Sequence, residues 1–294
     1  MSAMKWALAL AGFAAFAQKP PLAEIPLKIG DNYRLDLTAR INDTEFACSL
    51  DSGGGDRIYL DRSRAEAANI QATRQGQSAG PRDGTMNVDA RAVVTLEIGD
   101  VKLTGQELVM QNRPYAAYAC VIGLSVLKQY VVEIDYEAPA LRVYEAASFP
   151  PAERSIPFTM EQGNPFVTVN LDMPIGAPLQ ARMSVDTGGG RPAAYLTKTF
   201  IDRHDVMSRV IDAAPDAQSG SSGGQPRVLA AHLEKLTVGS TALARPLVFL
   251  WQVKGFGGSN EPDGLLCPGF LSRYKVTFDY PRRMLILAPA ARAR

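Results

Sequence analysis

Two aspartates stand in nearly identical short stretches of this sequence. Asp51 lies within residues 46–55 (FACSLDSGGG), and Asp186 lies within residues 181–190 (ARMSVDTGGG). In each stretch an apolar, strand-like run ends at the aspartate, a small hydroxyl residue follows, and glycines then permit a tight turn. Ionisation of both members of a close pair of carboxyl groups is unfavourable, because their like charges repel. The pair therefore shares one proton and supplies a general base and a general acid at once. Such a pair can activate water for the hydrolysis of an amide.

The similarity between the two halves continues beyond these stretches, with every landmark in the same order. Tyr59-Leu60 and Tyr195-Leu196 follow the glycines, and each pair precedes a segment with a helical pattern. The further matches are the helical segments 61–70 and 197–207, then 96–99 (LEIG) and 236–239 (LTVG), then 121–136 and 265–280. We therefore interpret the chain as an internal duplication of one fold. If the halves face each other, Asp51 and Asp186 meet across a two-fold axis.

These residues resemble the retropepsin-like, pepsin-type aspartyl proteases in a bacterial, single-chain, two-lobed form. The resemblance rests on the apolar-apolar-Asp-(Ser/Thr)-Gly motifs at Asp51 and Asp186 and on the apolar-apolar-Gly motif at 121–123, and it covers nearly the whole chain after the leader. It implies an all-β fold with short helices, in which two similar acid-protease-type β-barrel lobes enclose an active cleft. It also implies that Asp51 and Asp186 are the catalytic residues of an aspartic-type endopeptidase.

The same resemblance implies roles for the neighbours of the two aspartates. Ser52 and Thr187 are expected to hydrogen-bond across the lobe interface, and Gly123 is expected to let its strand pass close beneath the Asp51 loop. Gly53 and Gly188 are expected to let backbone N–H groups point at the carboxylates. Two glycine-rich flaps, 75–89 and 218–228, are expected to cover the cleft, with these glycines near their tips: Gly76, Gly80, Gly84, Gly220, Gly223 and Gly224.

Two features depart from the family pattern. The residue after Asp-(Ser/Thr)-Gly is Gly54 in one half and Gly189 in the other, where relatives often carry Ala, Ser or Thr. Without a hydroxyl group there, we expect an activity optimum at mildly acidic rather than extreme pH. The second half also has Cys267 where the first has Gly123. Its side chain is either tolerated or displaces the second aspartate loop.

The apolar pattern predicts β-rich lobes and a boundary between them. Apolar and polar residues alternate through 35–41 and 46–50 around an Asn42-Asp43 turn, and again through 167–171 and 183–185 around a longer turn. Consecutive prolines at Pro150-Pro151 interrupt regular structure. We therefore expect a first lobe at 18–149 and a second at 150–294.

The N-terminus has the pattern of a secretory signal peptide at residues 1–17. Lys5 precedes the apolar stretch 6–16, and Ala15-Phe16-Ala17 forms a small-x-small cleavage site. The sequence therefore predicts a periplasmic or secreted protein that keeps no stable membrane anchor after cleavage.

An oxidising compartment leaves two interpretations of Cys48 and Cys120. They precede Asp51 and the 121–123 motif, so a disulfide between them and a pair of small buried thiols are both compatible with the sequence. Cys267 is then left without a partner.

Composition and residue spacing limit the kinds of partner and cofactor that the sequence predicts. The formal net charge of +1, from 31 basic and 30 acidic residues, offers no electrostatic attraction for nucleic acid. The two histidines, His204 and His232, lack the spacing of metal ligands or of a Ser/His/Asp triad. We expect a peptide or protein substrate, no metal, no organic cofactor, and a monomer, since one chain carries both aspartates.

Two other functions remain compatible with the same sequence. One is an exported peptide-binding protein that keeps the protease fold without cleaving its ligand. The other is a structural periplasmic protein. Candidate residues for the wall of the cleft are Tyr115 and Tyr118 in one half and Trp251 and Phe256 in the other, although isolated aromatic residues at such positions more often pack in a core or at its rim.

Overall fold

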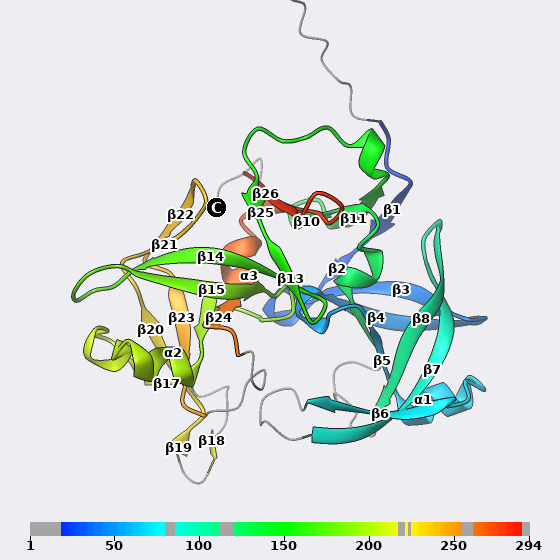
Figure 1. Cartoon of the computed structure of the whole chain (residues 1–294), viewed down its shortest axis with the longest axis horizontal. Coiled ribbons are helices and arrows are strands. Elements are labelled where there is room, and N and C mark those ends of the chain that lie inside the picture. Colours follow the sequence, from blue (N-terminus) through cyan, green and yellow to red (C-terminus); the bar gives the residue numbers. More distant parts are fainter. Residues whose placement is uncertain are drawn as a thin grey trace, which may run out of the picture.

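The computed structural model of the chain describes residues 19–79, 86–111, 120–216, 221–222, 225–253 and 261–289. The predicted signal peptide lies outside these residues. The described chain is mostly β, with short helices, as the alternating sequence pattern predicts. Figure 1 shows an eight-stranded sheet from the first half on the right, a ten-stranded sheet mainly on the left, and a six-stranded sheet above and between them.

The eight-stranded sheet of the first half contains a closed barrel. Its strands, in spatial order, are β2 (Lys28–Ile29), β3 (Leu35–Ile41), β4 (Thr44–Asp51), β9 (Cys120–Gly123), β5 (Ile58–Asp61), β8 (Val101–Gln111), β7 (Met86–Ile98) and β6 (Arg74–Ala79). The far end of β7 also pairs with β3, through Arg40 with Glu97 and Ile41 with Leu96, so the six strands from β3 to β7 form a ring. Ring closure removes the open edges of these strands.

The second half builds a sheet with matching pairings. In spatial order it contains β17 (Ala214–Pro215), β20 (Val228–His232), β23 (Leu247–Trp251), β16 (Ala194–Leu196), β24 (Gly264–Leu266), β15 (Leu179–Val185), β14 (Asn164–Asp172), β21 (Lys235–Val238) and β22 (Thr241–Ala244), and β13 (Thr159–Glu161) pairs with β14. Here β20 and β21 are separate strands, whereas the first half has the single long strand β7. β21 nevertheless pairs with β14 through Leu171 and Leu236, as β7 pairs with β3.

Side-chain alternation explains why the hairpins β3–β4 and β14–β15 form. Leu35, Leu37, Ala39 and Ile41 are buried inside the first barrel, and polar residues between them face outward. Asn42 adopts a positive φ of 52° in the two-residue turn between β3 and β4, a conformation that asparagine tolerates better than most residues. The turn predicted at Asn42-Asp43 is therefore present.

The six-stranded sheet is built from both halves, which the sequence pattern did not predict. Its order is β1 (Ala23–Pro26), β11 (Ala140–Tyr144), β10 (Val131–Asp135), β25 (Tyr274–Asp279), β26 (Met284–Pro289) and β12 (Ile156–Pro157). At its centre β10 pairs with β25 in antiparallel register, which joins Val132 to Phe278 and Ile134 to Val276. The main apolar core accordingly runs from Leu35 through Ile134 to Leu285 and connects the halves.

Short helices follow the strands at matching places. The described residues contain α1 (Arg62–Ala67), α2 (Lys198–Arg203) and α3 (Pro268–Leu271). They also contain the 3-10 turns η1 (Asp31–Tyr33), η2 (Ser52–Gly54), η3 (Leu124–Leu127), η4 (Ala146–Ser148) and η5 (Val206–Ser208). Asp61 caps α1 and Thr197 caps α2, each by accepting backbone N–H groups of the first turn. No helix in the described part of the chain has both the length and the apolar character required to cross a bilayer.

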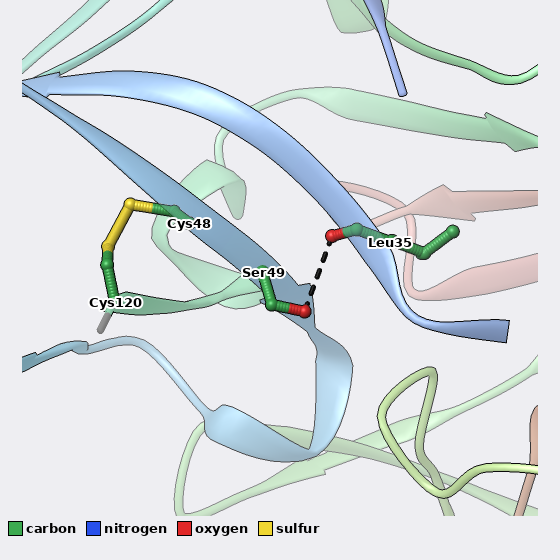
Figure 2. Close-up of a disulfide and its surroundings, with 4 residues drawn as sticks. All are labelled: Leu35, Cys48, Ser49 and Cys120. Atoms are coloured by element: carbon green, nitrogen blue, oxygen red, sulfur yellow. Dashed lines mark hydrogen bonds between the residues drawn. A yellow bond between two sulfur atoms is a disulfide. The ribbon is translucent and has the colours of Figure 1, made fainter. Parts of the chain in front are cut away.

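Cys48 and Cys120 form a disulfide, which decides between the two interpretations of these cysteines. The bond joins the neighbouring parallel strands β4 and β9, and Figure 2 shows it a few residues before the end of β4. In the same view the hydroxyl group of Ser49 reaches back to the carbonyl oxygen of Leu35 on β3, at 3.4 Å. The disulfide thus anchors the strand that ends at Asp51.

Candidate active site

Asp51 and Asp186 occupy the same position in the two halves. Asp51 is the last residue of β4, and Asp186 directly follows β15. Each carboxylate accepts a hydrogen bond from the backbone N–H two residues later, Gly53 to Asp51 at 2.7 Å and Gly188 to Asp186 at 2.8 Å. These charge-assisted bonds fix the orientation of both carboxyl groups.

The two carboxylates each lie against the loop of the other. A Cβ atom placed on Gly188 would lie 2.6 Å from Cγ of Asp51, and one placed on Gly53 would lie 2.8 Å from Cγ of Asp186. Both glycines are therefore required because a carboxylate of the opposite loop occupies the space of their side chain. The fold brings Asp51, Gly53, Asp186 and Gly188 into one cluster.

Ser52 and Thr187 join the two loops by reciprocal hydrogen bonds. The backbone N–H of Ser52 donates to Oγ1 of Thr187, and the backbone N–H of Thr187 donates to Oγ of Ser52, both at 2.9 Å. The Ser52 hydroxyl group also donates to the carbonyl oxygen of Val185 at 2.7 Å. Both side chains are almost completely buried, so these bonds are shielded from competing water and hold the loops rigidly together.

A turn from the opposite half covers each loop from outside. A Cβ atom on Gly55 would lie 3.2 Å from the carbonyl oxygen of Gln162, in the turn between β13 and β14. A Cβ atom on Gly190 would lie 3.6 Å from Cβ of Asn32, in η1. Each aspartate loop is thus held between its own sheet and a turn of the other half.

Gly123 and Cys267 show how the two loops tolerate different neighbours. A Cβ atom on Gly123 would lie 2.3 Å from the carbonyl oxygen of Gly55, so only glycine fits there. Cys267 fits at the matching position because Gly189 makes room: a Cβ atom on Gly189 would lie 2.4 Å from Sγ of Cys267. The Asp186 N–H still donates to the Leu266 carbonyl oxygen at 2.9 Å. Of the two outcomes expected for Cys267, the structure shows the tolerated side chain.

Two tyrosines at matching positions differ in their hydrogen bonding. Ser125 donates to the hydroxyl group of the buried Tyr280 at 3.3 Å. Tyr136, the matching residue, is half-buried, and its hydroxyl oxygen is buried without a partner. The residue that matches Ser125 is Gly269, two positions after Cys267, and backbone oxygen of Arg191 occupies the space of its side chain. Burial first, and then the negative charges of Asp186 and Asp51, raise the pKa of Tyr136.

The predicted flaps correspond to hairpins. β6 and β7 form one within 75–89, and β18 (Ser221–Ser222) and β19 (Gln225–Pro226) form one within 218–228. Gly76 lies inside β6, paired with Asp89, and not in the connection between the strands. The Arg91 guanidinium crosses it, since a Cβ atom there would lie 2.1 Å from Nε of Arg91. The other predicted flap glycines lie outside the described residues: Gly80, Gly84, Gly220, Gly223 and Gly224.

The outer faces of the two sheets, beside the aspartates, can be compared residue by residue. Directly paired residues on neighbouring strands point to the same face. One continuous row in the first half, here called the first row, consists of Ser49, Val121, Tyr59, Val109, Arg91 and Arg74. The same pairings in the second half give the second row, which consists of Ser184, Leu265, Tyr195, Phe249, Ala230 and Ala214. In their first four positions both rows have a serine, an aliphatic residue, a tyrosine and an apolar residue. They differ in the last two positions, where the first row has arginines and the second has alanines.

Charged side chains cluster around the first row. The Glu107 carboxylate accepts hydrogen bonds from Arg57 at 2.7 Å and from Arg91 at 2.9 Å, and it also pairs with Arg74. Burial disfavours the charged form of Glu107, but the hydrogen bonds from Arg91 and Arg57 outweigh it and lower the pKa of this carboxyl group. Burial raises the pKa of Tyr59, Arg57 opposes this, and the charge of Asp51 adds to it. Tyr59 is therefore within electrostatic range of both Arg57 and Asp51.

The second row is apolar and aromatic instead. The rings of Tyr195 and Phe249 meet at a centroid distance of 5.3 Å, and Trp251 lies 5.0 Å from Tyr195. Arg191 stacks over Phe249 and pairs with the buried Asp216, which balances its charge. Of the aromatic residues predicted to line a cleft, Trp251 is found here, whereas Tyr115, Tyr118 and Phe256 lie outside the described residues.

Sequence reasoning missed the cationic cluster. Arg57, Arg74, Arg91 and Glu107 are distant in the chain, and only the barrel brings them together. The single sequence signal was Arg91 among the apolar residues of 90–94 (ARAVV). Within the described ranges, no group of three or more His, Cys, Asp or Glu residues is arranged to hold a metal ion. The sequence matches no protein-family model and none of the curated proteins with which it was compared.

Proposed function

We propose that this protein is an aspartic-type endopeptidase with two similar, retropepsin-like lobes derived from an internal duplication. One observation carries the proposal: the carboxylates of Asp51 and Asp186 each lie against a glycine of the opposite loop, and reciprocal Ser52–Thr187 bonds hold the loops together. The shared register of the two sheets and the shared central sheet support the duplication. A cleft between the lobes, beside the two rows, would hold an extended peptide.

The chemistry follows from a shared proton. One carboxylate removes a proton from a water molecule, and the water oxygen attacks the carbonyl carbon of the peptide bond. The protonated carboxyl group of the pair donates its proton to the carbonyl oxygen, which gives a tetrahedral diol. Proton transfer to the nitrogen atom then lets the C–N bond break, leaving a carboxyl group and an amine. The rigid loop contacts keep both carboxyl groups aligned throughout these steps.

The proposed location is the periplasm or the exterior of the cell. The signal-like N-terminus motivates it, and the Cys48–Cys120 disulfide supports it because structural disulfides persist in oxidising compartments. Since one chain supplies both aspartates, we propose that the monomer is active.

The test is cleavage of a diverse peptide mixture by the wild type and by Asp51→Asn and Asp186→Asn, across pH. Each substitution is expected to lower kcat by about a thousandfold or more, because either one removes a member of the proton-sharing pair. Asp43→Asn, in the exposed β3–β4 turn, is the control and should cleave normally.

Two results would contradict parts of this proposal. Cleavage that survives both substitutions would exclude the aspartate mechanism, and specific peptide binding without cleavage would favour the peptide-binding alternative. The pH optimum is expected to be mildly acidic; a rate that peaks below about pH 3 would contradict that expectation.

A further inference from the structure

The cationic cluster beside the first row has more positive than negative charge. Three guanidinium groups, from Arg57, Arg74 and Arg91, share the carboxylate of Glu107. Asp89, two positions before Arg91 on β7, is a buried acidic residue on the same face. Arg57, Arg74 and Arg91, counted with Glu107 and Asp89, therefore carry one more positive than negative charge.

The three arginines differ in what they can reach. The Arg91 side chain is only 7% exposed, and it donates to Glu107 and to the carbonyl oxygen of Gln77 on β6. The role of Arg91 is therefore structural, because these hydrogen bonds connect the β6–β7 hairpin to the barrel. Arg57 and Arg74 have side chains that are 41% and 58% exposed, and Glu107 contacts one nitrogen atom of each. Arg57 also interacts with the hydroxyl group of Tyr59, and the N–H groups that remain on Arg57 and Arg74 can donate to a further anion.

The second half has no such cluster at the matching positions. Arg57 matches Ala193, because the carbonyl oxygen of Arg57 accepts from the Gly123 N–H and that of Ala193 accepts from the Cys267 N–H. Arg91 and Arg74 match Ala230 and Ala214 in the second row. The charge is therefore not required by the fold, since the same strand pairings form without it.

We propose that Arg57 and Arg74 bind an acidic side chain of the peptide substrate, on the side of the scissile bond that faces the first lobe. This inference rests on the proposed function, because it assigns a substrate preference to the same cleft. Aspartate or glutamate is the expected residue, since a carboxylate accepts two parallel N–H bonds from a guanidinium group. At the second row, Tyr195, Phe249 and the adjacent Trp251 are instead buried in an aromatic cluster.

The test uses a set of otherwise identical apolar peptides that carry Glu, Gln or Lys at one position, moved stepwise along the peptide. Binding to the uncleaving Asp186→Asn variant is measured by fluorescence anisotropy, with Asp51→Asn in parallel, and cleavage is measured with the wild type. At one position Glu is expected to bind about tenfold more tightly than Gln, and Lys more weakly than either. Raising the salt concentration should reduce this preference.

Arg57→Gln combined with Arg74→Gln should abolish the preference for Glu while binding of the Gln peptide stays unchanged. The matched control is Arg40→Gln, which removes a half-exposed arginine that pairs with Glu97 where β3 meets β7. It should leave the preference intact. Circular dichroism and thermal unfolding confirm that the double variant remains folded.

The outcomes separate this inference from the proposed function. Cleavage without any preference for Glu, or a preference that survives the double substitution, would overturn the inference and leave the peptidase intact. Glu-selective binding without cleavage by the wild type would uphold the inference and overturn the peptidase. Absence of both binding and cleavage would overturn both.

Discussion

The two halves of this protein share their strand pairings but differ in the residues that those strands present. Around each aspartate the backbone hydrogen bonds, the glycine contacts and the small hydroxyl residues match. The neighbouring residues differ, with a disulfide, Gly123 and an arginine cluster in the first half, and the buried Cys267 and an aromatic cluster in the second. The reciprocal contacts between the two loops constrain the centre, whereas the surroundings are asymmetric.

The largest expected difference in stability is between substitutions at Gly123 and at Cys267. Gly123→Cys should destabilise the protein by about 3 kcal/mol or more, because the new side chain meets rigid backbone at 2.3 Å. Cys267→Gly should cost about 1–2 kcal/mol, since it removes a small buried side chain and adds backbone freedom. Urea unfolding measures both. Equal losses of stability in the two variants would contradict the expected difference between these two strands.

The disulfide should stabilise the first half alone. Cys48→Ala with Cys120→Ala is expected to cost about 2–4 kcal/mol, because the bond closes a loop across 72 residues of sequence. The matching paired positions in the second half are Met183 and Gly264, which cannot be bridged. Hydrogen exchange should therefore speed up in β4, β5 and β9 before β15, β16 and β24. Uniform acceleration in both halves would argue against a local role.

Glu107 should give the first half a pH dependence that the second half lacks. Its pKa is lower in the folded protein, so its stabilising contribution is present above the unfolded pKa and disappears as the pH falls through the folded value. Glu107→Gln should cost about 1–3 kcal/mol at neutral pH, because Arg91 stays buried without its carboxylate, and much less once the pH has fallen below the lowered pKa of Glu107. Unfolding at several pH values tests this, with the exposed Glu137→Gln as the control. A constant difference across pH would refute it.

The reciprocal bonds of Ser52 and Thr187 should contribute alike. Ser52→Ala and Thr187→Val are each expected to cost about 1–2 kcal/mol, since each leaves a buried backbone N–H group without its acceptor. The double variant should cost less than the sum, because the two side chains act on one interface. A double-mutant cycle by urea unfolding measures the coupling. Strict additivity would mean that the two loops are held independently.

The smallest expected difference in stability is between substitutions of Tyr136 and Tyr280. Tyr136→Phe removes a hydroxyl group that has no partner and should leave stability unchanged or raise it by up to about 1 kcal/mol. Tyr280→Phe removes the acceptor of Ser125 and should lower stability by about 1 kcal/mol. Thermal unfolding compares them. A loss of stability in Tyr136→Phe would indicate that its hydroxyl group is satisfied in solution, for example by a buried water.

Several local features could be predicted because neighbouring residues decide them. The alternation at 35–41, the Asn42 turn and the glycines after each aspartate depend on side-chain polarity and backbone freedom within a few positions. The central sheet could not be predicted in this way. Val131–Asp135 is apolar enough for any buried strand, and its partner Tyr274–Asp279 lies in the other half of the chain.

The sequence by itself determined that two aspartates have the same local surroundings, since the motif, the glycines and the order of landmarks repeat. Tertiary structure decided which contacts these residues make: that Asp51 lies against Gly188, that Cys267 is accommodated by Gly189, and that four charged residues gather beside Tyr59. The physical reason is that contacts between strands depend on the register and closure of the sheets. Register and closure arise from the packing of the whole chain and not from any single stretch of it.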